Sequence, residues 1–173
     1  MKRLGLPFCM LALLAATAAF AQTAQPPAPR EEAPEAEALR ALEKALTRRG
    51  SYAANGFLRR LDTRDFGGCK VMYDLTPQAA PDHVGFVPFA ERTTVNLSAL
   101  DPTRVAVKAG RRGASISFAA RADSAVIERQ LGQGPHGFGE VTRLSSAYIY
   151  VPSREGAEEV RAALVRAIEA CAK

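Results

Sequence analysis

Two cysteines far apart in the chain constrain the possible fold more than any other feature. The sequence contains three cysteines, and Cys9 lies in an N-terminal segment that resembles a signal peptide. Export to an oxidising compartment would leave Cys69 and Cys171 able to pair. Because that bond would close a loop of about 100 residues, the chain-entropy model gives it about 4.7 kcal/mol of stabilisation. Two separate buried thiols are the alternative. The sequence contains no C-x-x-C motif, which would indicate a redox role.

The order of charged, apolar and small residues predicts a signal peptide over 1–21. Lys2-Arg3 precedes an apolar stretch over 4–14, and Ala19-Phe20-Ala21 is typical of a cleavage site. We therefore expect a periplasmic or secreted protein that begins at Gln22. Retention as an anchor is the alternative, although the apolar stretch is shorter than the roughly 20 residues that cross a bilayer. After cleavage we expect no transmembrane span.

The charge of the mature chain gives little support for a polyanionic partner. The full sequence has 23 Lys and Arg against 18 Asp and Glu, and the predicted signal peptide removes two cations, which leaves 21 against 18, or +3. Such a small excess over a whole domain does not indicate nucleic-acid binding. We expect the partner to be a protein or another component of the cell envelope.

Composition and periodicity divide the mature chain into three segments. Residues 22–34 are rich in Pro and Ala, which predicts a disordered tether. Residues 35–65 are predicted to be an N-terminal helical segment. It comprises an amphipathic helix over 35–49 and a second helical piece within 55–62. Residues 66–173 are predicted to be an α+β domain.

Apolar residues alternate with polar ones through most of the third segment. This pattern predicts about seven short strands, from Cys69 to Leu75 and over 86–89, 93–97, 105–107, 116–120, 126–131 and 144–151. Ser153 then caps a predicted helix that runs to about Ala172. Its apolar stripe is formed by Val160, Leu164, Ile168 and Cys171.

These elements predict an α+β fold with a bent antiparallel sheet. Strands with one apolar face need a cover, and the terminal helix offers the largest apolar stripe. Cys69 and Cys171 would both point inward in that arrangement, which favours their pairing. The expected architecture is a bent sheet or a partly open barrel with an N-terminal and a C-terminal helix. An open α+β sandwich is the alternative.

No motif in the sequence identifies a catalytic centre. His83 and His136 both fall in predicted loops, and neither H-E-x-x-H nor G-x-S-x-G occurs. We therefore predict no catalytic residue, metal or cofactor. A basic turn formed by Lys108, Arg111 and Arg112 is a candidate anion-binding site, with a solvated charged turn as the alternative.

Two stretches of the sequence resemble an uncharacterised exported bacterial domain with pleckstrin-homology-like topology. The first is the strand-and-turn sequence from Thr93 to Pro102, which ends in Leu-Asp-Pro, and the second is Ala-x-x-x-Ala-Ile-x-x-Cys from Ala163 to Cys171. The resemblance covers roughly 66–173. It implies a bent two-layer sheet closed at one end by the last helix. It carries over neither catalytic residues nor a phosphoinositide site.

Three functions fit these expectations. The first is a non-enzymatic interaction module, because the architecture is well defined and no chemical motif is present. The second is a hydrolase of envelope material, which would need a histidine brought against a carboxylate or serine by the fold. The third is a carrier of a small ligand or lipid, with a pocket lined by aromatic side chains such as Tyr148 and Tyr150.

Overall fold

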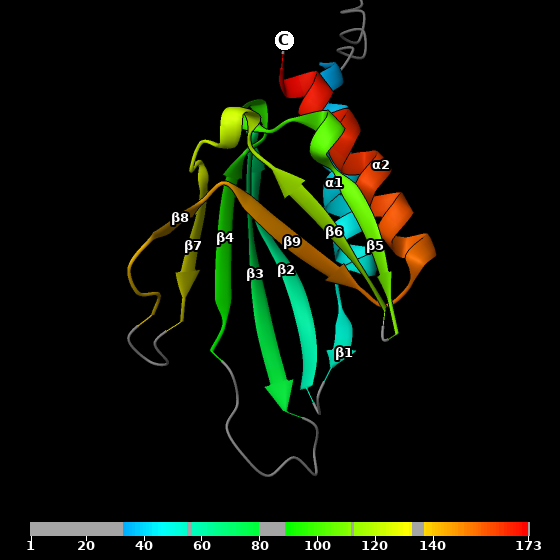
Figure 1. The fold of residues 1–173 in the computed structure, drawn as a ribbon, viewed down its shortest axis with the longest axis vertical. Helices are drawn as coiled ribbons and strands as arrows, with labels where there is room; N and C mark the ends of the chain where they lie inside the picture. The colour runs from blue at the N-terminus through cyan, green and yellow to red at the C-terminus, as the bar shows by residue number, and fades with distance from the viewer. Residues whose placement is uncertain (1–32, 55–56, 80–88, 112, 133–136, 173) are drawn as a thin grey trace, which may run out of the picture. The chain divides into compact units, whose positions relative to one another are not determined.

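The computed structural model describes residues 33–54, 57–79, 89–111, 113–132 and 137–172. The predicted signal peptide and most of the predicted tether lie outside these residues. The described residues form two helices and nine strands, which confirms the predicted α+β class (Figure 1). The helices are α1 (Pro34–Arg49) and α2 (Arg154–Cys171). The strands are β1 (Tyr52–Ala54), β2 (Phe57–Gly67), β3 (Lys70–Ala79), β4 (Glu91–Asn96), β5 (Ala106–Gly110), β6 (Gly113–Ala119), β7 (Ile127–Leu131), β8 (Thr142–Leu144) and β9 (Ser146–Val151).

The strands form two antiparallel sheets that share a corner. One sheet has the order β1-β2-β3-β4-β7-β8, and the other has the order β5-β6-β9. The chain passes from β8 to β9 through Ser145, where it changes sheets, and Ala120 N donates a 2.8 Å hydrogen bond to Ser145 O at the same corner. In Figure 1, β9 runs diagonally across the larger sheet. Both sheets keep free end strands, so the described strands form an open arrangement rather than a closed barrel.

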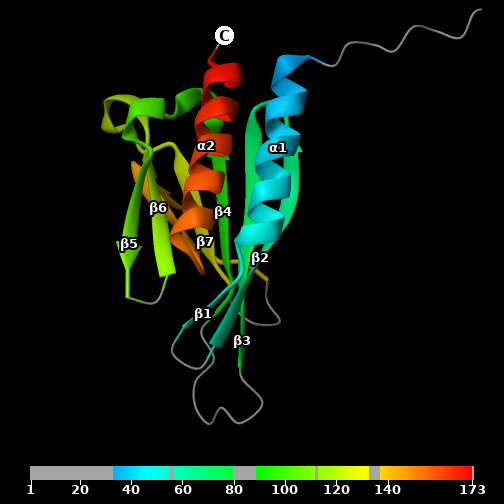
Figure 2. The ribbon, with the colours of Figure 1, turned by 90° about the vertical axis from the view of Figure 1, so that its right-hand side faces the viewer.

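The two helices lie side by side and complete the core (Figure 2). The apolar stripe predicted for α2 is buried, with Val160 and Ile168 fully covered and Leu164 only 3% exposed. This helix packs on β5, β6 and β9, whereas α1 packs on β2. Ser153 Oγ accepts a hydrogen bond from Gly156 N at 3.0 Å, which confirms the predicted N-cap of α2. The C-terminal helix is therefore the cover that the sheets require.

The second helical piece predicted within 55–62 is wrong. Residues 57–62 belong to β2, which pairs with β3 from Phe57 opposite Ala79 to Gly67 opposite Lys70. The spacing of Phe57, Leu58 and Leu61 fits a helix as well as a strand, and a short apolar run does not distinguish the two. Leu61 is buried, but Leu58 is 46% exposed. The long hairpin with β3 supplies backbone partners that an isolated turn of helix lacks.

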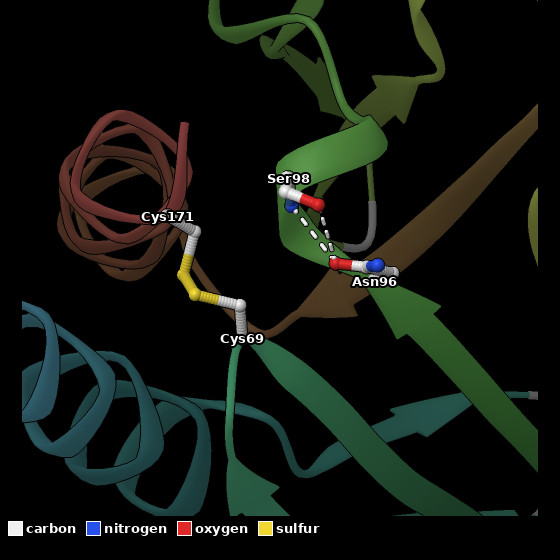
Figure 3. The surroundings of a disulfide bond; sticks show 4 residues. All are labelled: Cys69, Asn96, Ser98 and Cys171. Atoms are coloured by element: carbon white, nitrogen blue, oxygen red, sulfur yellow. Dashed lines mark hydrogen bonds between the residues drawn. A yellow bond between two sulfur atoms is a disulfide. The ribbon is translucent and has the colours of Figure 1, made fainter. Parts of the chain in front are cut away.

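The predicted disulfide is present between Cys69 and Cys171, which are 102 residues apart in sequence (Figure 3). It joins the end of α2 to the turn between β2 and β3. Cys69 was predicted on the apolar face of a strand, but it lies in that turn with a φ of 61°. Gly68 also has a positive φ of 56°, as the central residues of a tight hairpin turn require. Cys69 O also accepts a 2.8 Å hydrogen bond from Leu97 N.

Candidate functional site

A cavity of about 890 Å³ lies between the two sheets. The larger sheet forms its floor. Within that sheet Leu75 lies opposite Glu91, Thr93 opposite Arg129, and Ile127 opposite Leu144, so the floor residues all share one face. That face continues into the core, since Thr93 and Ile127 are buried. The floor is formed by Arg59, Leu75, Glu91, Thr93, Ile127, Arg129 and Leu144.

The opposite wall of the cavity is formed by β9 and by the β5–β6 hairpin. Five of the six residues of this strand line the cavity, namely Ser146, Ala147, Tyr148, Tyr150 and Val151. Successive side chains of a strand point to opposite faces, so a cavity over one face would touch only alternate residues. The cavity therefore reaches the main chain of β9 as well as the face that carries Tyr148 and Tyr150. The tip of the β5–β6 hairpin closes one end of this wall.

The edge of β9 that faces away from β6 has no strand partner among the described residues. The hydrogen bond from Ala120 N to Ser145 O fixes the phase of the β6–β9 ladder. Because main-chain groups of an antiparallel strand alternate in direction, those of Ala147, Ile149 and Val151 point toward β6. The N–H and C=O groups of Ser146, Tyr148 and Tyr150 therefore point to the free edge. Together they offer a row of donors and acceptors beside the cavity.

Three tyrosines surround this edge. The rings of Tyr52 and Tyr150 lie 5.5 Å apart in a tilted arrangement, and they join β1 to β9. Tyr148 and Tyr150 are 55% and 46% exposed, which is high for large aromatic side chains. Burial raises the pKa of Tyr52, opposed by the nearby Arg59, so its hydroxyl is neutral at physiological pH. The tyrosines offer flat apolar surfaces with polar ends.

The charged side chains of the cavity are predominantly basic. Arg59, Lys108 and Arg129 face the single carboxylate of Glu91. In the described part of the chain, none of these four side chains forms an ion pair within 4.0 Å. An excess of cations beside apolar and aromatic surface favours a ligand that carries negative charge.

The predicted basic turn contributes only in part to this cavity. Lys108 lies in the cavity wall, whereas Arg111 is exposed at the tip of the β5–β6 hairpin. Arg112, His83 and His136 lie outside the described residues. The sequence singles out neither of the cations on the floor. Arg59 lies in the segment predicted to be a second helical piece, and Arg129 has the pattern of an ordinary solvent-facing residue of a strand.

The other face of the larger sheet carries a second polar cluster around Asp74, which is 3% exposed. Arg92 donates two hydrogen bonds to this carboxylate at 2.8 and 2.9 Å, and Arg64 donates one at 2.8 Å. Burial disfavours the charged carboxylate, but the hydrogen bonds from Arg92 and Arg64 hold the pKa of Asp74 below its ordinary value. The Arg92 guanidinium also lies 4.1 Å from the centre of the Phe138 ring. This cluster joins three strands, and both oxygens of Asp74 accept hydrogen bonds from arginines.

A further group of potential metal ligands is explained by the disulfide. Glu35 lies close to the sulfur atoms of Cys69 and Cys171. Because each sulfur is bonded to the other, neither is the thiolate that metal coordination requires. The two cysteines therefore act as a covalent link here.

No family model, curated protein or solved structure shows significant similarity to this chain. Among the described residues, neither helix combines the length and the apolar character that a membrane span needs.

Proposed function

We propose that this protein is a periplasmic or secreted binding module that holds an anionic ligand in the cavity beside β9. The observation that carries this proposal is the combination of cations that form no ion pair with any described side chain and an exposed aromatic edge. Arg59, Lys108 and Arg129 leave an excess of positive charge in the cavity, and Tyr148 and Tyr150 keep large apolar surfaces exposed. Exposed aromatic rings and free arginines are the groups that dominate binding surfaces.

The form of the cavity supports a binding module over a carrier. A carrier of apolar molecules needs a closed apolar chamber, but here one wall is a strand edge with polar main-chain groups. Tyr148 and Tyr150 do line the cavity, but two other aromatic side chains that a carrier pocket could use lie elsewhere. Phe118 is buried in the core and Phe138 stacks on Arg92, on the other face of the sheet. The hydrolase hypothesis depends on histidines that lie outside the described residues, and nothing in the cavity wall favours it.

The tyrosines make this proposal directly testable. The sequence contains four tyrosines and no tryptophan. Three tyrosines line the cavity, and Tyr73 is buried in the core at 1% exposure. Fluorine NMR of protein labelled with 3-fluorotyrosine therefore reports on the cavity through three resonances and on the core through one. Phenylalanine substitutions assign them.

We expect polyglutamate to shift the resonances of Tyr52, Tyr148 and Tyr150, to leave that of Tyr73 in place, and to bind more weakly as salt is added. Arg129→Gln should weaken binding, whereas the matched variant Arg143→Gln on the opposite face of β8 should not. Unchanged cavity resonances at saturating polyglutamate would contradict the proposal. Stoichiometric uptake of laurate in place of polyglutamate would favour the carrier, and cleavage of the probe would favour the hydrolase.

A further inference from the structure

We infer that the ligand is an extended acidic peptide segment that pairs with the free edge of β9 as an added strand. This inference rests on the proposed function and specifies how the cavity binds. It follows from three features of the described residues: a strand edge without a strand partner, a floor whose side chains share one face, and an excess of cations. Each of them restricts the chemistry of the occupant.

The main-chain groups on the free edge of β9 are satisfied best by a partner that has the geometry of a β-strand. Ser146, Tyr148 and Tyr150 direct their N–H and C=O groups outward at every second residue. An extended peptide presents donors and acceptors with the same repeat, which is how strand addition to a sheet edge gains its affinity. A small anion such as a free carboxylate would leave most of this row unused.

The floor selects the side chains of such a peptide. Its apolar part is formed by Leu75, Ile127 and Leu144, and Arg59 and Arg129 lie on the same face. A paired strand would turn every second side chain to that face. Apolar side chains would cover the first group, and acidic side chains would meet the arginines. We therefore expect a segment in which acidic and apolar residues alternate.

Charge also argues against a second copy of this chain as the occupant. Pairing of β9 with β9 across a two-fold axis would bring the same cations, Lys108 and Arg129, toward their own copies. Repulsion between like charges at close range opposes such a dimer. An acidic partner relieves that repulsion, since it neutralises the cations that no described side chain pairs.

The test is fluorescence anisotropy with a labelled peptide of alternating glutamate and valine, about as long as β9. We expect this peptide to bind and the matched lysine–valine peptide not to bind. N-methylation of alternate amides on one edge removes about three main-chain hydrogen bonds, so it should weaken binding by roughly 30-fold or more. Methylation of the opposite edge should leave the affinity nearly unchanged.

A pair of protein variants tests the same main-chain hydrogen bonds by changing β9 instead of the peptide. Tyr148→Pro removes the outward N–H without breaking the ladder to β6, because proline is tolerated where an edge N–H faces solvent. Tyr148→Ala removes the same ring but keeps the N–H. We expect Tyr148→Pro to bind about threefold to tenfold more weakly than Tyr148→Ala. Circular dichroism confirms that both variants fold.

Three results would overturn the inference. Equal binding of the peptides methylated on either edge would show that no strand pairing occurs, while the proposed anionic site would stand. If the lysine–valine peptide bound as tightly as the glutamate–valine peptide, the cations of the cavity would not select the ligand. Self-association in sedimentation velocity that Tyr148→Pro abolishes would assign the edge to a second copy. If polyglutamate also left the cavity tyrosines unchanged, the proposed function would fail as well.

Discussion

Removal of the disulfide tests how the C-terminal helix is held in place. The double variant Cys69→Ala/Cys171→Ala opens a loop between positions 102 residues apart. The chain-entropy model assigns such a loop about 16 cal/mol/K, or about 4.7 kcal/mol at room temperature. Since a domain of this kind is stable by roughly 5–15 kcal/mol in total, the bond accounts for a large share of the stability.

The expected loss is about 3–5 kcal/mol, because residual contacts in the unfolded chain reduce the entropic gain. Urea denaturation followed by far-UV circular dichroism measures it. The m-value should rise in the double variant, since the unfolded chain without the bond exposes more surface. Wild-type protein in reducing agent is the matched control and should behave like the variant. A loss below about 1 kcal/mol would refute the reasoning and would mean that packing alone holds α2.

Two further perturbations separate packing from polar contacts. Leu164→Ala should cost about 2–5 kcal/mol in urea denaturation, because Leu164 is 3% exposed and its removal leaves a cavity. Arg166→Ala is the control, and it should change the free energy of unfolding by no more than about 0.5 kcal/mol. Arg161→Ala should lower that free energy by about 1 kcal/mol, because Arg161 donates a 3.1 Å hydrogen bond to Val105 O. Equal effects of Leu164→Ala and Arg166→Ala would contradict the role of α2. Asp74→Asn should cost about 1–3 kcal/mol at neutral pH, because Arg64 and Arg92 remain partly hydrated when they lose their partner. The lowered pKa of Asp74 means that this contribution is complete above the unfolded value of about 4 and disappears as the pH falls through the folded value. The difference between Asp74→Asn and wild type should therefore shrink in acid, and a constant difference would show that the carboxylate's charge is not involved.

Much of the fold follows from the periodicity of apolar residues. The predictions from periodicity that are wrong have a common cause. The stripe from Val160 to Cys171 predicts α2 and its buried face, because a long amphipathic pattern has one interpretation. The region around Leu58 and Leu61 is short, and only its hairpin with β3 decides that it is a strand. The last predicted strand, over 144–151, is divided at Ser145 because the chain changes sheets there, which no local pattern encodes.

The candidate site was largely invisible in the sequence for a different reason. Arg59 and Arg129 lie 70 positions apart in the sequence and line the same cavity only because of the order of strands in the larger sheet. Tyr148 and Tyr150 were noted as aromatic residues, but their exposure depends on the absence of a strand beside β9 among the described residues. The resemblance to a pleckstrin-homology-like domain remains a prediction, since no comparison bears on it.

The proposed binding mode depends most directly on the free edge of β9, and residue-resolved amide hydrogen exchange by NMR measures that edge. Without ligand, the amides of Ser146, Tyr148 and Tyr150 should exchange quickly, whereas those of Ala147 and Ile149 should be protected by the ladder to β6. Addition of the alternating glutamate–valine peptide should slow the exchange of the first group. Uniform protection along β9 before the peptide is added would contradict the central claim, because the edge would already be occupied.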